Sequence, residues 1–255
     1  MYFVGIDIGS TNAKIILIDK ENKILYKQAL LTGFNSRDVA NSLINDLVIS
    51  GYDKKDMVIV ATGYGRVSVP EAKKTITEIT CHAKGAISLF NNNNLVIIDI
   101  GGQDTKIIDV TNGEVTDFLM NDKCSAGTGR FLDVMSKTMG VSIDELVNMS
   151  KFGGGVTISS LCTVFAESEI ISLIGRSEKK ENIANAIVKS IITKISSQVS
   201  KIDYRKKQVC LTGGLCELDI FLDMMSDMLN TKVISDKNAK YAGAIGAAIL
   251  AKDVI

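Results

Sequence analysis

Two copies of one short pattern carry the polar residues best suited to bind a phosphate group. The segments Ile6–Ile16 and Ile98–Ile108 lie 92 residues apart and are identical at seven of eleven positions. Each copy has an aspartate, a glycine two residues later, small polar residues and then a lysine. Glycine lets backbone amides approach a ligand closely, and amides, hydroxyls and ammonium groups stabilise phosphate. We therefore expect two facing loops that clamp a polyphosphate and its cation.

Two ordinary β-hairpins are the alternative for this repeat. A hairpin needs only Asn-Gly or Asp-Gly in its turn, and the repeated polar set exceeds that need. A third glycine turn, Thr212-Gly213-Gly214, follows the predicted strand Val209–Leu211. Such a turn can pass beneath a purine ring, because a side chain there would block stacking.

Cys124 and Cys162 are the second set of residues whose type and position could support chemistry. Each is predicted to lie on a loop just before a helix, where the positive end of the helix dipole stabilises a thiolate. Reduced thiols or metal ligands are the roles expected for them. The other cysteines, Cys81, Cys210 and Cys216, are expected to be small buried residues, and His82 is expected to be structural.

The hydrophobic pattern predicts the elements that position these residues. In the first half we expect strands at Tyr2–Ile8, Ala13–Asp19, Ile24–Leu30 and Met57–Ala61, a helix capped by Ser36, and a helix starting at Pro70. In the second half we expect strands at Leu95–Ile100, Thr105–Val110, Val115–Met120 and Val156–Ser160, helices at Arg130–Met139, Thr163–Leu173 and Glu181–Val199, a capping box at Ser142 and Glu145, and a last helix at Tyr241–Ala251.

The order of elements occurs twice, which predicts a duplicated α/β fold with a nucleotide cleft between the copies. The run Asn91–Asn94 forms neither core nor a good helix, so the domain boundary is placed there. The first subdomain is predicted to span 1–94 plus about 240–255, and the second 95–239, with the two loop cysteines. The last helix is rich in Ala and Gly, which predicts close packing onto the first subdomain.

Composition limits the function classes. The 255 residues include 29 basic and 29 acidic residues, so the net charge is zero and no nucleic-acid or membrane partner is indicated. No apolar run reaches the roughly 18 residues needed to cross a bilayer. Five dispersed cysteines do not resemble a secreted disulfide framework. A cytoplasmic protein is therefore expected.

The ordered set of motifs resembles one known family over essentially the whole chain. The motifs are GIDIGSTNAK, ATGYGR, DIGGQDTK, NDKCSAGTGRFLDVM, CTVFAESEI and LTGG. They are similar to the activators of 2-hydroxyacyl-CoA dehydratases, or archerases, which are BadF/BadG/BcrA/BcrD-type ATPases related to benzoyl-CoA reductase subunits. The resemblance implies two ribonuclease-H-like domains of the actin, sugar-kinase and heat-shock chaperone superfamily.

The resemblance also implies cofactors, partners and residue roles. It implies an ATPase that binds ATP or ADP with Mg²⁺, and a homodimer that bridges one 4Fe-4S cluster through Cys124 and Cys162. The expected partners are an iron–sulfur acceptor such as a 2-hydroxyacyl-CoA dehydratase, and ferredoxin or flavodoxin as electron donor. Asp7 and Asp104 would hold Mg²⁺ through water, with Asp104 and Gln103 orienting the attacking water. The nucleotide-binding residues would be Gly9, Ser10, Thr11, Asn12, Lys14, Gly101, Gly102, Thr128, Gly213, Gly214 and Glu217.

Two other functions remain open at this point. One is a small-molecule kinase of the amino-sugar type, with the same fold and no cluster. The other is an ATP-dependent interaction module without enzymatic activity. Neither a Walker A pattern nor GxGxxG occurs, so other common nucleotide-binding folds lack support.

Overall fold

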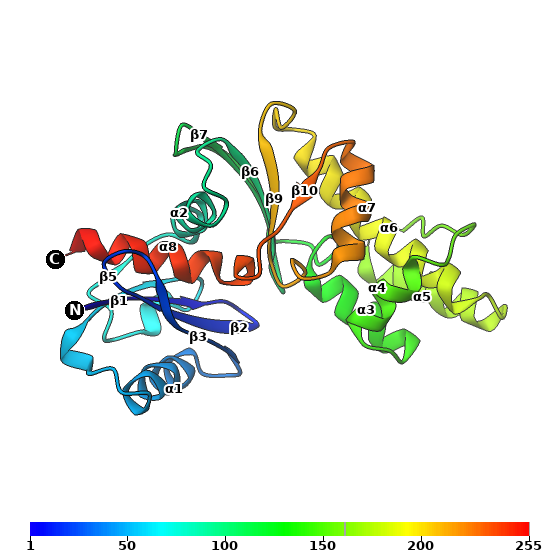
Figure 1. Ribbon diagram of the computed structural model, residues 1–255. Helices are drawn as coiled ribbons and strands as arrows, with labels where there is room; N and C mark the ends of the chain where they lie inside the picture. Colours follow the sequence, from blue (N-terminus) through cyan, green and yellow to red (C-terminus); the bar gives the residue numbers. More distant parts are fainter. Residues whose placement is uncertain (161, 255) are drawn as a thin grey trace. The chain divides into compact units, whose positions relative to one another are not determined.

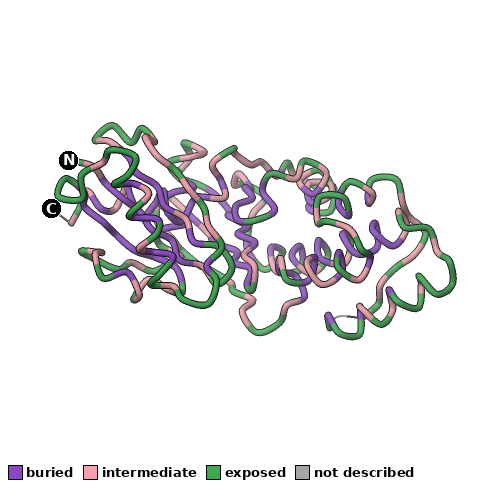
Figure 2. The backbone as a smooth tube through the Cα atoms, turned by 90° about the horizontal axis from the view of Figure 1, so that it is seen from below, coloured by how far each residue is buried: buried purple, intermediate pink, exposed green. Residues whose placement is uncertain are grey.

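The computed structural model describes residues 1–160 and 162–254 (Figure 1). The chain forms two compact units. The first comprises Met1–Asn94, Val110–Phe118 and Asp236–Ile255, and the second comprises Leu95–Asp109 and Leu119–Ser235. Residue 255, the end of the first subdomain range predicted above, lies outside the described residues. Buried positions concentrate in the strands and on the inner faces of the helices, and the connecting loops are mostly exposed (Figure 2).

The first unit is built on a five-stranded sheet in the order β3-β2-β1-β4-β5. Strand β1 pairs antiparallel with β2 and parallel with β4. Helix α1 covers one face, and helices α2 and α8 cover the other, so the central strands are buried on both sides. The bounds are β1 Tyr2–Ile8, β2 Asn12–Ile18, β3 Ile24–Leu31, β4 Met57–Thr62, β5 Lys74–Thr75, α1 Ser36–Ile49, α2 Glu78–Phe90 and α8 Ala242–Leu250.

Helices α2 and α8 pack with their backbones in contact, because glycine occupies the contact points. A Cβ atom added to Gly246 would lie 1.7 Å from the carbonyl oxygen of Cys81, and one added to Gly85 would lie 1.9 Å from that of Ala242. On strand β1, a Cβ on Gly5 would lie 1.9 Å from the carbonyl oxygen of Ala244. The predicted close packing of the last helix onto the first part of the chain is confirmed.

The second sheet has the order β10-β9-β6-β7-β8, with β9 parallel to both β6 and β10. Helix α6, Lys180–Val199, has buried isoleucines at four-residue intervals. The strands are β6 Leu95–Ile100, β7 Thr105–Thr111, β8 Glu114–Asn121, β9 Gln208–Gly213 and β10 Val233–Ile234. The helices are α3 Gly129–Met139, α4 Ile143–Ser150, α5 Thr163–Gly175, α6 Lys180–Val199 and α7 Asp219–Leu229.

Three local predictions are wrong. Asn35, not Ser36, caps α1, because its side chain accepts a hydrogen bond from the Arg37 amide. Pro70 does not start a helix: α2 begins at Glu78, capped by Thr77. The segment 156–160 forms no strand, because Glu169 of α5 binds the backbone amide of Ser159 at 2.9 Å and the hydroxyls of Ser159 and Ser160.

Other features match or extend the sequence-based expectations. The capping box of Ser142 and Glu145 is present at the start of α4. Helix α7 and the two-residue strands β5 and β10 were not predicted. None of the described helices combines enough length and apolar character to cross a membrane.

We predict that Gly246→Ala destabilises the protein by roughly 3 kcal/mol or more, because the new methyl group overlaps backbone atoms that cannot yield. Urea unfolding of the full-length chain would measure this loss. Gly175→Ala is the matched control, since nothing lies within 4 Å of a Cβ added there. Equal stability of the two variants would contradict the tight helix crossing.

Candidate functional site

Asp7 lies at the end of strand β1 and has a buried carboxylate with spare bonding capacity. Its relative exposure is 4%, and its Oδ1 atom has no hydrogen-bond partner among the residues that the structure describes. A Cβ on Gly63 would lie 2.5 Å from Asp7 Oδ1, and one on Gly243 would lie 2.6 Å from Asp7 Oδ2. Glycine at these two positions leaves room beside the carboxylate. A buried, unpaired carboxylate oxygen suits a cation or its water ligands.

The first predicted phosphate loop follows Asp7 and is held in a fixed shape. The Gly9 amide donates to the carbonyl of Asn12 at 3.0 Å, and the Thr32 hydroxyl donates to the carbonyl of Gly9 at 2.7 Å. Lys14 pairs with Asp7 across β1 and β2, so the two side chains lie on the same face of the sheet. Ser10, Thr11 and Asn12 are exposed, which leaves their polar groups available to a ligand.

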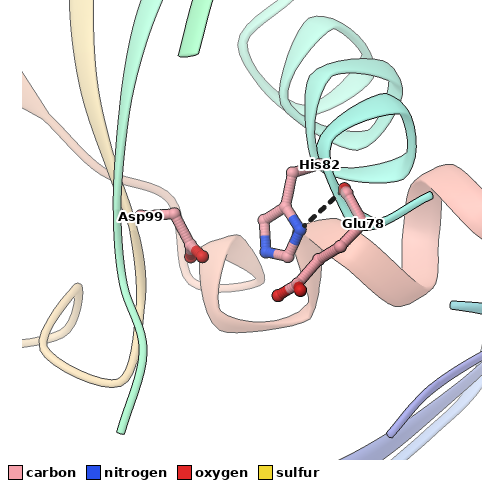
Figure 3. Close-up of side chains that lie close together, drawn as sticks. All are labelled: Glu78, His82 and Asp99. Carbon is pink, nitrogen blue, oxygen red and sulfur yellow. Dashed lines mark hydrogen bonds between the residues drawn. The ribbon is translucent and has the colours of Figure 1, made fainter. Parts of the chain in front are cut away.

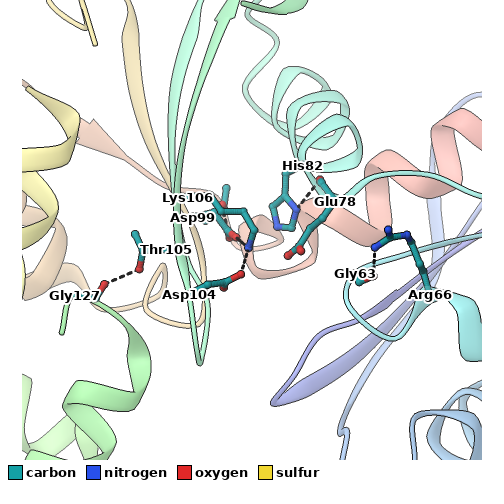
Figure 4. Close-up of polar contacts among 10 residues, drawn as sticks. Gly63, Arg66, Glu78, His82, Asp99, Asp104, Thr105, Lys106 and Gly127 are labelled. Atoms are coloured by element: carbon teal, nitrogen blue, oxygen red, sulfur yellow. Dashed lines mark hydrogen bonds and ion pairs between the residues drawn. The ribbon is translucent and has the colours of Figure 1, made fainter. Parts of the chain in front are cut away.

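The second loop repeats this geometry in the second unit. The Gly101 amide donates to the carbonyl of Asp104 at 2.9 Å. The carboxylate of Asp104 accepts a hydrogen bond from the ammonium of Lys106 at 2.7 Å, and this ammonium lies 3.5 Å from Asp99 (Figure 4). Gln103 is exposed at the tip, whereas Asp104 is buried. The roles of both residues in orienting water remain predictions.

Lys106 is a functional candidate that the sequence reasoning missed. Its side chain is 1% exposed and lies between two carboxylates. Removing one member of such a buried ionic group typically costs about 3–5 kcal/mol, because a charge is left uncompensated. The repeat itself was the available signal, since Lys106 occupies the position of Lys14.

The structure also extends the duplication to a second pair of turns. Strand pairing places Asp7 opposite Thr62 and Asp99 opposite Thr212. Each of the two threonines is followed by a glycine. Gly63 and Gly213 have φ angles of +85° and +87°. In the first turn the Gly65 amide donates to the carbonyl of Ile8, and in the second the Gly214 amide donates to that of Ile100, both at 2.9 Å. The two turns lie 150 residues apart, so they do not share the 92-residue spacing of the phosphate loops.

The two halves differ in how their aspartates are satisfied. The Thr212 hydroxyl donates to Asp99 Oδ1 at 2.9 Å, whereas Asp7 Oδ1 has no such donor among the described residues. Asp99 also has the nearby Lys106 ammonium. Of the two aspartates, Asp7 is therefore the one with a buried carboxylate oxygen that has no hydrogen-bond partner among the described residues. Near the second turn, Gly214 and Glu217 are exposed, and Gly213 is buried.

The two loop cysteines are exposed, and Cys81, Cys210 and Cys216 are buried, as predicted. Cys162 is the N-terminal cap residue of α5, and Cys124 precedes α3 by several residues. The hydroxyl groups of Ser125 and Thr163 lie 2.8 Å apart. Since these residues are next to Cys124 and Cys162, the two cysteine-bearing loops lie side by side within the second unit.

Side chains hold the backbone of the segment 121–128, which we call the cysteine loop. The Asn121 amide group donates to the carbonyls of Cys124 and Ala126, both at 2.9 Å. The Thr128 hydroxyl is buried and donates to the carbonyl of Ser125 at 2.8 Å. Its predicted nucleotide contact remains a prediction, and in this structure it stabilises the loop. Cys124 is therefore presented to solvent by a well-held backbone.

His82 and Cys81 lie in the first unit, on helix α2. The Nδ1 atom of His82 lies 3.2 Å from the carbonyl oxygen of Glu78, one turn earlier in the same helix (Figure 3). Burial raises the pKa of the Cys81 thiol from 9.0 to about 12, and burial also raises the pKa of Cys210. Both buried thiols are therefore protonated near neutral pH and are poor nucleophiles.

Comparison with known proteins gives consistent matches over the whole chain. The sequence model of the BadF/BadG/BcrA/BcrD ATPase family matches residues 4–251. The 2-hydroxyisocaproyl-CoA dehydratase activator of Clostridioides difficile is 38% identical over 256 residues, which is 99% of this chain and 96% of the relative. The (R)-2-hydroxyglutaryl-CoA dehydratase activating ATPase of Acidaminococcus fermentans is 39% identical over 254 residues, covering 98% and 97%.

A solved structure gives the same picture. The activator of the 2-hydroxyisocaproyl-CoA dehydratase from Clostridium difficile, with bound ADPNP, has a TM-score of 0.92 at 38% sequence identity. The match covers 99% of this chain and 95% of that chain.

We predict that two of the five thiols in the native, iron-free chain react rapidly with Ellman's reagent at pH 8 and that three react only after unfolding. Exposure gives the reagent access to Cys124 and Cys162, whereas burial and a raised pKa protect Cys81. Release of the coloured thiolate measures the count. Rapid reaction of a third thiol would contradict the burial pattern.

Proposed function

The chain belongs to the BadF/BadG/BcrA/BcrD ATPase family, and we propose that it is an ATP-hydrolysing activator that passes single electrons to an acceptor protein. The proposed acceptor is a 2-hydroxyacyl-CoA dehydratase or a related iron–sulfur protein. Relatives that match nearly the whole chain are activators of such dehydratases. The observation that carries the proposal is the pair of exposed cysteines, held side by side in the unit that also contains the second phosphate loop.

ATP is the proposed nucleotide, and ADPNP, bound to a relative of the same fold, is an ATP analogue. In the first unit, Asp7 would hold Mg²⁺ through water, because it has an unpaired buried oxygen. Ser10, Thr11, Asn12 and Lys14 would contact the terminal phosphates, since the loop tip is exposed and its shape is fixed. The cation supplies charge compensation for the triphosphate, and the loop amides and hydroxyls orient it.

The second unit presents its phosphate loop differently. Gly101 and Gly102 are half-buried, and Gln103 is exposed beyond them. Asp104 is occupied by Lys106, so the exposed amide of Gln103 is the better placed of the two to orient a water molecule. The Lys106 ammonium partly neutralises the negative charges of Asp99 and Asp104, which limits their repulsion of an anionic ligand.

The residues present fit a 4Fe-4S cluster shared by two chains. Cys124 and Cys162 are the exposed thiols, and a cluster takes four thiolates, which two chains supply. This requirement supports the proposed homodimer. When bound, the cluster supplies a one-electron carrier, with reduced ferredoxin or flavodoxin as the proposed donor. Cys162 is the N-terminal capping residue of α5.

Hydrogen bonds connect the second phosphate loop, where the nucleotide would bind, to the helix that follows Cys124. The first two amides of α3, from Gly129 and Arg130, donate to the carbonyls of Gly101 and Gly102 at 2.9 and 2.8 Å. Helix α3 and the cysteine loop before it are thus attached to the second phosphate loop. A change of bound nucleotide that moves this loop changes the geometry at the cysteines, and hydrolysis reverses it.

We predict that Asp7→Asn lowers the apparent Mg²⁺ affinity in ATP hydrolysis by about tenfold or more, because loss of an outer-shell carboxylate typically costs that much. Steady-state phosphate release at varied Mg²⁺ concentration measures the effect. Asp117→Asn, on the exposed side of β8, is the control and should behave like the parent chain. An unchanged Mg²⁺ dependence of the Asp7 variant would contradict the assignment.

We also predict that the chain purified without oxygen is brown and holds about four irons per two chains. Cys124→Ser or Cys162→Ser should lose the iron while the chain remains folded, and Cys216→Ala, a buried control, should keep it. Iron analysis and circular dichroism provide the two readouts. A chain that stays colourless under these conditions and phosphorylates an amino sugar would instead be a kinase.

A further inference from the structure

Three hydrogen bonds join the segment 101–105, which contains the second phosphate loop, to the cysteine loop and to the start of α3. Two run from the α3 amides of Gly129 and Arg130 to the phosphate-loop carbonyls. The third runs from the hydroxyl of Thr105, directly after the phosphate loop, to the carbonyl of Gly127 at 2.6 Å (Figure 4). Of these three, the Thr105 bond alone is made by a side chain, so a substitution can remove it.

We propose that Thr105 is a positioning residue that transmits movement of the second phosphate loop to Cys124, and that Ser125 passes it on to Cys162. The inference rests on the proposed function, in which a nucleotide binds this phosphate loop. It adds the particular side chains through which the loop acts on the thiols.

Thr105 is firmly attached to the loop on one side. It is fully buried and lies between Asp104 and Lys106, which are bonded to each other at 2.7 Å. A shift of the segment 101–104 therefore carries Thr105 with it, because neighbouring backbone and the ion pair move together.

Thr105 is equally well attached on the cysteine side. Gly127 has a φ of +91°, and a Cβ there would lie 3.0 Å from Lys194 Cγ, so the backbone at this position is closely packed. The Asn121 side chain binds the carbonyls of Cys124 and Ala126, which makes the segment 124–127 one hydrogen-bonded body. A displacement of the Gly127 carbonyl therefore also displaces the backbone of Cys124.

The contact between Ser125 and Thr163 extends the path to the second thiol. Their hydroxyls lie 2.8 Å apart, and Thr163 is the first residue of α5, directly after Cys162. Thr163 is 9% exposed, so its hydroxyl is largely shielded from competing water. Both thiols therefore respond to the same displacement.

The first test compares thiol alkylation with and without a bound nucleotide. The full-length chain, freed of iron by a chelator and a reductant, is treated with iodoacetamide, and modification of Cys124 is followed by mass spectrometry. Saturating Mg·ADPNP should change the rate at Cys124 by about fivefold, the equivalent of one net hydrogen bond. Thr105→Val should weaken this response, because only the two backbone bonds of α3 then remain. Thr105→Ser, which keeps the hydroxyl, should retain the full response.

Thr111→Val is the matched control, because Thr111 lies on the same strand and its hydroxyl contacts Thr116 instead. Calorimetry with Mg·ADPNP ensures that each variant is compared at saturation. The proposal is overturned if Thr105→Val responds like the parent chain, or if Thr105→Ser fails as Thr105→Val does. A parent chain that binds Mg·ADPNP without a change at Cys124 overturns the coupling alone, whereas failure to bind it overturns the proposed function as well.

Ser125→Ala tests the second link and serves also if Thr105→Val does not fold, because Ser125 is partly exposed. In this variant the nucleotide response should persist at Cys124 and disappear at Cys162. An unchanged response at both thiols would overturn the role of Ser125.

Discussion

The attachment of helix α3 to the second phosphate loop is the interaction that holds this loop and the cysteine loop together. The first amides of a helix lack partners within the helix, and at α3 the carbonyls of Gly101 and Gly102 accept from them. A Cβ on Gly129 would lie 3.1 Å from the Gly101 carbonyl oxygen, so a small residue is needed for this approach. The helix start, the phosphate loop and the cysteine loop therefore form one connected structure.

The duplicated halves have kept one backbone framework and diverged in their charges. Both place an aspartate opposite a threonine in a Thr-Gly turn, and both close the polar loop with an amide-to-carbonyl bond at its base. Asp99 is satisfied by Thr212 and the buried Lys106, whereas Asp7 keeps an unpaired oxygen. This difference is the basis for the cation site proposed in the first half.

The hydrophobic pattern predicted most strands and helices, because burial of one or both faces requires a regular spacing of apolar residues that is visible in the sequence. Two of the failures are local, since Asn35 and not Ser36 caps α1, and α2 begins after Thr77 and not at Pro70. The others depend on contacts beyond neighbouring residues. Glu169 captures the backbone at Ser159 and prevents a strand, and the short strands β5 and β10 exist only through their partners. Helix α7 was also missed. At the site, the exposed cysteines were found from their loop context, whereas Lys106 and Thr105 were not.

The sequence by itself determined that a polar loop was duplicated, that two cysteines precede helices, and that the chain carries the motifs of one family. These features are local in the chain, so residue type and spacing are sufficient to reveal them. Only the tertiary structure decided which aspartate keeps an open oxygen, which carbonyl Thr105 reaches, and that Ser125 meets Thr163. Each of these depends on contacts between residues far apart in the chain, and such contacts are set by packing and not by spacing.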